Sequence, residues 1–183
     1  MKIKLSIFFI GLSILTFGQV ALGKEEISNS SVSLEFGTQY RGFILPYVTS
    51  LSSVSNAVPG TVVMDSSDGI VKYARHNGDW KELTFNTTHT FGGVTVDTTG
   101  KVDTSLQKTK AEQTEASVII GANTSNQPSG ILVLSDNNKA MILPKMDSPH
   151  LKIINPAPGM MAYDTKTNQL AVFNGTVWTF WKD

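Results

Sequence analysis

The chain has 183 residues, with 15 basic and 15 acidic side chains and therefore no formal net charge. A charge balance of this kind gives no electrostatic attraction toward nucleic acid or an anionic membrane surface. Cysteine is absent, which excludes disulfide bonds, a thiol nucleophile, thiolate metal sites and the lipidated cysteine of a bacterial lipoprotein. Packing, length or assembly must therefore stabilise the protein.

Residues 1–23 have the features of a Sec signal peptide. Two lysines precede the apolar run Leu5–Phe17, and Ala21 and Gly23 are the small residues that signal peptidase reads. The run is shorter than the roughly 20 apolar residues that cross a bilayer. We therefore expect cleavage after Gly23, or alternatively after Gly18, and no membrane insertion afterwards. The mature chain is expected in the periplasm, on the cell surface or outside the cell.

Residues 24–83 are expected to form the first β module. Short alternating apolar and polar runs broken by turn residues are typical of strands. Pro59-Gly60 fits the centre of a type II turn, and Asn77-Gly78 before Trp80 fits a type I′ turn, whose two central residues both have positive φ. Pro46 cannot donate to a strand ladder, so the strand containing it is an edge strand or ends its pairing there. The expected strands are 33–36, paired with 42–48, and then a meander of 61–64, 70–74 and the segment at residue 80.

Residues 84–128 connect this module to a second one. Phe85–Val96 has strand and turn character, and Ala116–Ile120 has strand character. Thr104–Glu115 is polar and lacks glycine and proline, so it is either a short helix or a flexible tether.

Residues 129–183 repeat the first module. An Ile-Leu-Pro strand, a Pro-Gly turn, an aspartate, an Asn-Gly turn and a tryptophan recur at an offset of 97 to 99 residues. Ser148-Pro149 also predicts one helical turn, with Ser148 as N-cap and Pro149 at the first helical position. The matched positions are Pro46 and Pro144, Gly60 and Gly159, Asp65 and Asp164, Asn77 and Asn174, Gly78 and Gly175, and Trp80 and Trp178. The duplication keeps residues that determine shape, with no recurring histidine or acidic pair.

This pattern resembles a repeat found in secreted proteins of the Bacteroidetes, especially flavobacteria, and in the hairpin-rich tips of phage tail-fibre-like proteins. Residues 159–178 and 41–46 carry the resemblance. The first copy departs from it in the hairpin Asp65–Gly69, and Arg75-His76 adds length before Asn77. The resemblance implies an exported, β-rich surface or fibre module that is often part of a larger assembly, and it brings no catalytic residues.

Aromatic residues concentrate on the two meanders and are the candidates for contact with a ligand or partner. Flat rings stack on sugars, so an exported adhesin would use them in this way. We expect Trp80 and Trp178 to fill the core beneath their own hairpins. Trp181 is the better candidate for exposure, and Tyr163 and Tyr73 are further candidates.

Other chemistry has weak support in the sequence. His76, His89 and His150 lack metal-binding spacing, and Asp65–Gly69 lacks the distal glutamate of a calcium loop. No nucleophile motif of a hydrolase is present. We expect no cofactor, no metal and no enzymatic activity. Thr98, within Asp-Thr-Thr, matches a short context for O-glycosylation in Bacteroidetes.

The sequence therefore predicts an all-β protein with two divergent copies of a small antiparallel strand and meander module. The expected role is a secreted, non-enzymatic, fibre-like structural protein that presents loops and self-associates or joins a larger surface assembly. The alternative is a carbohydrate-binding adhesin whose exposed aromatics bind a glycan.

Overall fold

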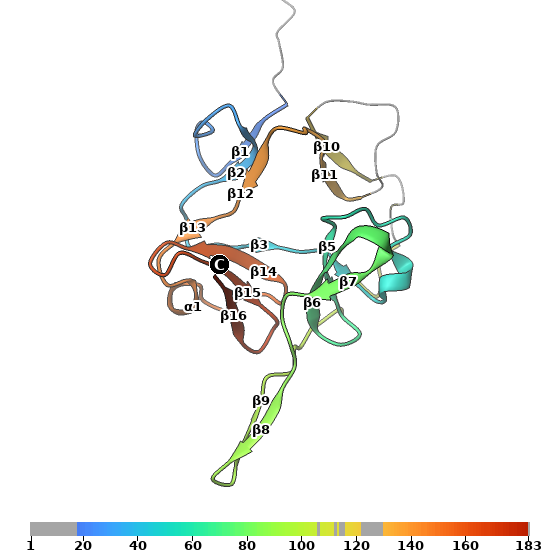
Figure 1. Cartoon of the computed structure of the whole chain (residues 1–183), viewed down its shortest axis with the longest axis vertical. Helices are drawn as coiled ribbons and strands as arrows, with labels where there is room; N and C mark the ends of the chain where they lie inside the picture. Colours follow the sequence, from blue (N-terminus) through green and yellow to red (C-terminus); the bar gives the residue numbers. More distant parts are fainter. Residues whose placement is uncertain (1–17, 106, 112, 114–115, 122–129, 183) are drawn as a thin grey trace, which may run out of the picture.

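A computed structural model describes residues 18–105, 107–111, 113, 116–121 and 130–182. The expected all-β fold is confirmed: the described chain consists of short strands, with one turn of α-helix and two turns of 3-10 helix. Figure 1 shows the two meander sheets side by side, smaller strand groups at one end and a projecting hairpin at the other. The strands of the first half are β1 (Val20–Leu22), β2 (Val32–Phe36), β3 (Phe43–Ile44), β4 (Tyr47–Val48), β5 (Val62–Asp65), β6 (Ile70–Ala74) and β7 (Trp80–Glu82). Those that follow are β8 (Thr88–Phe91), β9 (Val94–Asp97), β10 (Val118–Ile120), β11 (Leu132–Leu134), β12 (Ala140–Ile142), β13 (Lys145–Met146), β14 (Met160–Asp164), β15 (Gln169–Phe173) and β16 (Trp178–Trp181).

The two meanders have the predicted topology. Strands β5, β6 and β7 are consecutive antiparallel neighbours, and so are β14, β15 and β16. Each meander gains a parallel strand on its outer edge, β4 beside β5 and β13 beside β14. The same arrangement, a three-stranded meander with one parallel edge strand, therefore occurs in both halves of the chain.

The Pro-Gly turns are confirmed as type II. The Thr61 N–H donates to the Val58 carbonyl at 3.1 Å, and the Met160 N–H donates to the Ala157 carbonyl at 3.1 Å. In both turns glycine occupies the third position with positive φ, 92° at Gly60 and 72° at Gly159, a conformation that costs glycine little.

The type I′ expectation for the Asn-Gly pairs is wrong. The first pair lies in a 3-10 turn, His76–Gly78. At the second pair Gly175 has positive φ and Asn174 does not. At the second pair the Asn174 side chain instead accepts the N–H groups of Thr176 and Val177 at 2.9 and 2.8 Å. An asparagine that closes the turn with its own carboxamide has no need of a left-handed backbone.

The strands upstream of each meander pair differently from the prediction. Strand β2 does not pair with β3, and β11 does not pair with β12. Strand β2 instead lies between β1 and β12, and β11 pairs with β10, all in parallel. The Ile-Leu-Pro strands do change partner at their prolines: β3 pairs with β14, and β4 pairs with β5.

The repeat is longer than the sequence comparison indicated. Val20 pairs with Leu34 in the first half, and Val118 pairs with Leu132 in the second, both displaced by 98 residues (118 − 20 and 132 − 34). Strand β10 is thus the counterpart of β1, and β11 that of β2. We call residues 18–82 the first repeat and residues 116–181 the second repeat. Strand β1 lies inside the segment that the sequence predicts as signal peptide, whose residues 1–17 are outside the described part.

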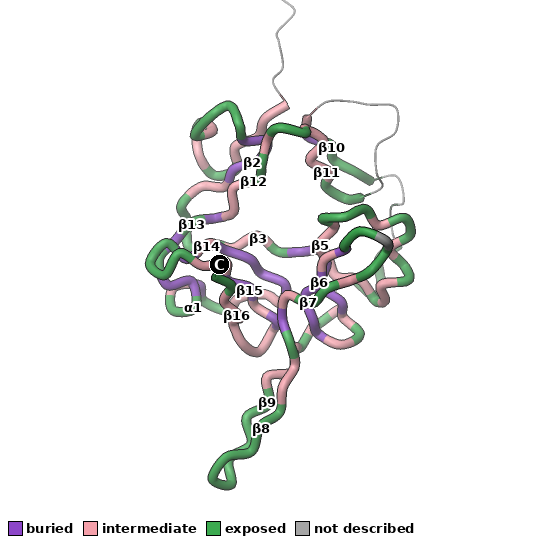
Figure 2. Tube along the Cα trace, viewed as in Figure 1, coloured by how far each residue is buried: buried purple, intermediate pink, exposed green. Residues whose placement is uncertain are grey.

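One hydrophobic core joins the two repeats. Met64 and Val71 of the first meander pack with Met161 and Val172 of the second, and Leu45 completes the cluster. These residues are almost completely buried, and Figure 2 shows buried segments in both meander sheets. A module of this size has a marginal core when alone, so burial shared between repeats stabilises both.

The connector is a hairpin followed by turns. Strands β8 and β9 form an exposed ribbon that projects from the body (Figures 1 and 2), as the strand and turn pattern predicted. Within the described residues of 104–115 there are turns and no helix, and residues 106, 112, 114 and 115 lie outside the described part.

The base of the connector is clamped between the two meanders. The Lys101 N–H donates to the Asn174 carbonyl at 3.1 Å, and the Asn174 side chain donates to the Thr98 carbonyl at 2.8 Å. On the other side, the Asn86 amide donates to the Asp68 carbonyl at 2.5 Å. Gly100 passes close to Gly69 here. The connector therefore holds together the hairpin turns of both repeats.

A helical turn follows each Ile-Leu-Pro strand. In the first repeat it is a 3-10 turn at Leu51–Ser53, capped by the Ser50 hydroxyl. In the second it is α1 (Pro149–Lys152), with proline at its start as predicted. Ser148 is the N-cap residue, as predicted, but its side chain makes no cap hydrogen bond. Its backbone N–H donates to Asp164 Oδ1 at 3.1 Å instead.

Candidate self-association surface

Two of the three candidate aromatics lie on one face of the second meander. Tyr163 is paired with Leu170, and Leu170 is paired with Trp181 across β14, β15 and β16. Side chains that are directly opposite on neighbouring strands share a face. Tyr73 lies on β6 of the other meander, so the three residues do not form one platform.

Trp181 is partly exposed, at 38%, but its ring is fixed at both edges. Its indole N–H donates to the Leu83 carbonyl at 2.6 Å, and Phe85 lies edge-on at 6.3 Å between ring centres. The residue therefore ties the last strand to the end of the first repeat. No sequence pattern indicates this contact, because it depends on how the repeats pack.

Trp178 is half-buried on β16 and lies against a core cluster rather than within it. Its ring lies 5.2 Å from that of Phe173 and packs on the cluster that contains Met146 and Met160. Trp80, its counterpart, is half-buried on β7. The carbohydrate-binding alternative stays a prediction.

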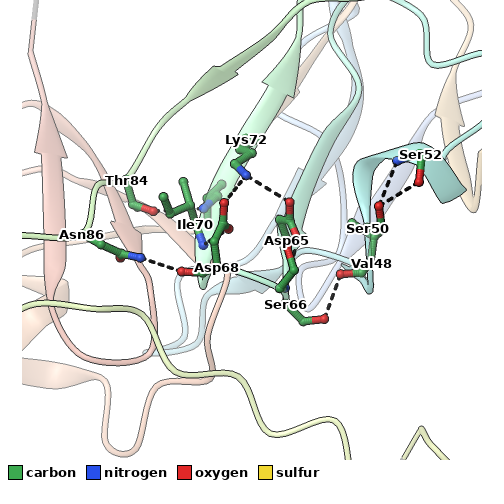
Figure 3. A network of polar contacts seen from close by, with 12 residues as sticks. Val48, Ser50, Ser52, Asp65, Ser66, Asp68, Ile70, Lys72, Thr84 and Asn86 are labelled. Atoms are coloured by element: carbon green, nitrogen blue, oxygen red, sulfur yellow. Dashed lines mark hydrogen bonds and ion pairs between the residues drawn. The ribbon is translucent and has the colours of Figure 1, made fainter.

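A buried ion pair occupies the hairpin Asp65–Gly69, the segment that partly resembles a calcium loop (Figure 3). Lys72 Nζ donates to Asp65 Oδ2 at 3.0 Å and also contacts Asp68. Ser67 donates to Asp65 Oδ1 from both its N–H and its hydroxyl, at 3.0 and 2.6 Å. Burial alone would raise the pKa of Asp65, but the Ser67 and Lys72 donors outweigh it and lower that pKa. The lysine ammonium supplies the positive charge that a cation would bring.

The corresponding aspartate of the second repeat has no lysine beside it. Asp164 is fully buried, and its Oδ1 accepts the N–H groups of Ser148 and Lys166 at 3.1 and 2.9 Å. Ala171 stands opposite Ala162, at the sheet position that corresponds to Lys72 opposite Val63. Burial raises the pKa of Asp164, but these backbone donors lower it further than burial raises it. The recurring aspartate is therefore a structural residue that fixes the start of each hairpin.

No group of three or more histidines and acids within the described residues is arranged to hold a metal ion. A hollow near the end of β1 and β2 is lined by Leu22, Phe36, Gln39, Arg41 and Pro144 among others, without a carboxylate or histidine. None of the helices in the described part is long and apolar enough to span a membrane.

Thr98 lies at the base of the β8–β9 ribbon and stays a predicted glycosylation site. Its hydroxyl accepts the Thr87 N–H at 2.9 Å and donates to the Thr87 carbonyl at 3.0 Å. Attachment of a glycan to this oxygen would remove the hydrogen bond that it donates.

Strand edges that lack a partner are the main unassigned feature of the described chain. Strand β11 is paired only with β10, and β12 ends the sheet that β1 and β2 begin. Strand β5 is covered by β4 only at Met64 and Asp65, which leaves Val62 without a neighbour on that side. Open edges present unpaired backbone donors and acceptors and are templates for strand addition.

Apolar side chains gather at these edges in the second repeat. Ile131 is 68% exposed and Leu132 37%, whereas their counterparts Ser33 and Leu34 are 0% and 1% exposed. Strand β12 pairs with β2 beside Ser33 and Leu34. No described strand pairs with β11 in the same way beside Ile131 and Leu132. Further exposed apolar residues nearby are Val118, Ile119 and Met141. Grouped exposed apolar residues mark interaction surfaces.

Residues 119–182 match the family model of the phage tail like trimerisation region. The match begins within β10 and runs through β16, so it covers almost the whole second repeat. A search of curated proteins found no match. A search of solved structures also found none.

The second half of this strand-rich chain is thus similar to a self-association region of phage tail type. The similarity is to a structural class of domain, and it includes the repeat that carries the exposed edge β11.

Proposed function

We propose that the protein is an exported, non-enzymatic structural component that assembles into trimers of tail-fibre type and presents its loops on the assembly. The single observation that carries this proposal is the match of residues 119–182 to a trimerisation region. It is supported by the exposed apolar edge of β10 and β11, which a monomer would leave in water.

The projecting β8–β9 ribbon is the element best placed for presentation. Its strands are exposed throughout, and Phe91 at its tip is 90% exposed. Its base is fixed to both repeats through Asn86 and Asn174, so the ribbon is held at a defined place on the body.

Light scattering of the full mature chain across a wide concentration range tests the assembly. We expect a single species with three times the chain mass. A monodisperse monomer at every concentration would refute self-association, and any other stoichiometry would refute the trimer.

We further infer that export is accompanied by cleavage after Gly18. The Gln19 side chain donates to the Ser30 and Val32 carbonyls at 3.1 and 2.7 Å, and β1 covers one edge of β2. Cleavage after Gly23 would remove both. The intact mass of the exported protein should correspond to a chain that begins at Gln19, and a chain that begins at Lys24 would contradict this inference.

A further inference from the structure

We propose that copies of this chain join head to tail, the second repeat of one copy to the first repeat of the next, by repeating the strand pairings that join the two repeats within a chain. The proposal rests on the proposed self-association and specifies its contact. The partner is a second copy of the chain, and the contact consists of two strand pairings in a defined register.

Two pairings connect the repeats within one chain. Strand β2 of the first repeat pairs with β12 of the second, with Leu34 opposite Met141. Strand β3 pairs with β14, with Ile44 opposite Met160, and the Leu45 N–H extends this ladder to the Gly159 carbonyl at 3.1 Å. Each pairing joins one strand of a repeat to a strand of the following repeat.

The second repeat has the same outgoing strands, but no described strand pairs with their outer edges. Strand β11 corresponds to β2, and β12 corresponds to β3. The first repeat has the corresponding receiving strands, since β3 corresponds to β12 and β5 corresponds to β14. The edge of β3 away from β14, and the edge of β5 beside Val62, carry no described strand. The unpaired edges of β11 and β12 in the second repeat are therefore complementary to those of β3 and β5 in the first repeat.

The backbone groups point in the directions that this contact requires. Ala140 donates to the Ser31 carbonyl, so Ala140 and Ile142 face β2. Because alternate residues of a strand direct their hydrogen-bonding groups to opposite edges, Met141 and Leu143 face away from β2. Their counterparts in the first repeat are Phe43 and Leu45, which face β14.

The receiving edge has matching geometry. The Gly60 N–H donates to the Ala74 carbonyl at 3.0 Å, just as the Gly159 N–H donates to the Phe173 carbonyl at 2.8 Å. The Gly60 carbonyl therefore has the orientation of the Gly159 carbonyl. Among the described hydrogen bonds, the Gly60 carbonyl and the Leu143 N–H have no partner, and the proposed contact joins them.

Side-chain sizes are complementary at the crowded point of the contact. Within the chain, Gly42 lies so close to Met160 that a Cβ on Gly42 would be 2.2 Å from the Met160 side chain. In the contact between chains, the corresponding residues are Ala140 and Thr61. Ala140 is larger than Gly42, and Thr61 is smaller than Met160. The combined side-chain volume at this point is therefore similar in the two contacts.

The register predicts that Thr61 of one copy lies opposite Ile142 of the next. This pair adjoins the bonded Gly60 and Leu143 pair, so it is of the non-hydrogen-bonded type, with Cα atoms about 4.5 Å apart, within the range that a disulfide spans. Because the chain has no cysteine, a chain carrying Thr61→Cys and Ile142→Cys should form disulfides only between copies. The matched control, Ile44→Cys with Met160→Cys, should close within one chain.

Non-reducing electrophoresis of the oxidised full chain separates the outcomes. Covalent oligomers from the Thr61 and Ile142 variant, with a covalent monomer from the control, support the contact. If the wild-type chain is oligomeric by light scattering but this variant gives no disulfide, or one within a chain, the proposed contact is overturned and the proposed function stands. If the wild-type chain is monomeric, both fall.

A second measurement does not depend on cysteine variants. Met141→Lys places a charge on the outward edge of β12, and charges on edge strands block strand addition. We expect this variant to be monomeric by light scattering, while Phe91→Lys, the same exchange type at the ribbon tip, keeps the wild-type mass. Retention of the oligomer by Met141→Lys, or its loss in Phe91→Lys, would overturn the proposal.

Discussion

The ion pair of the first hairpin offers the sharpest test of what stabilises a repeat. Lys72→Met keeps the apolar stem of the side chain but removes the ammonium that lies 3.0 Å from Asp65 Oδ2. Both groups are nearly inaccessible, with 10% and 4% of their side chains exposed. Removal of one partner from a buried pair costs about 3 to 5 kcal/mol, since the other charge is left uncompensated.

We expect a loss of about 3 kcal/mol, at the lower end of that range, because Ser67 continues to donate two hydrogen bonds to Asp65. Chemical denaturation at neutral pH, followed by tryptophan fluorescence, gives the free energy of unfolding. The double variant Lys72→Met with Asp65→Asn should recover a large part of the loss, because no buried charge remains. A loss below about 1 kcal/mol in the single variant, or no recovery in the double variant, would refute the reasoning.

Two further changes probe other parts of the fold. Gly100→Ala places a Cβ 1.9 Å from the Gly69 carbonyl oxygen and 2.7 Å from that of Asn174, so the connector must move. We expect a loss of at least about 2 kcal/mol in the free energy of unfolding. An unchanged melting temperature would contradict the role of the connector in holding the two hairpin turns. Lys24 and Ser28 hold the pKa of Glu35 at about 2. Since this pKa is lowered on folding, the stabilisation is present at neutral pH and is lost as the pH falls from about 4.5 toward 2. Glu35→Gln should flatten the stability profile across that window, and a profile as steep as that of the wild-type chain would exclude the assigned role.

Local pattern was sufficient for the meanders. Pro-Gly pairs followed by apolar runs specify a type II turn and a strand through backbone sterics alone, and the structure confirms them at Gly60 and Gly159. The repeat offset was visible for the same reason, because residues that determine turns recur at fixed spacing. The Asn-Gly prediction failed because the Asn174 carboxamide offered the backbone a different hydrogen-bonding solution.

Pairings between distant segments were not predictable from pattern. Strand β12 reaches β2 from more than a hundred residues away, and nothing in the sequence of either strand specifies that neighbour. The bond from Trp181 to Leu83 is of the same kind. The candidate surface also escaped prediction: Ile131 and Leu132 read as ordinary strand residues, and only the comparison with buried Ser33 and Leu34 shows that a covering strand is missing.

The strand class, the positions of the turns and the duplication follow from the amino-acid pattern, since all three depend on interactions between near neighbours along the chain. Tertiary structure alone decided which strands meet and which edges stay open. Backbone hydrogen bonds in a sheet are the same for every residue, so the choice of partner depends on how the two repeats pack around Met64, Val71, Met161 and Val172.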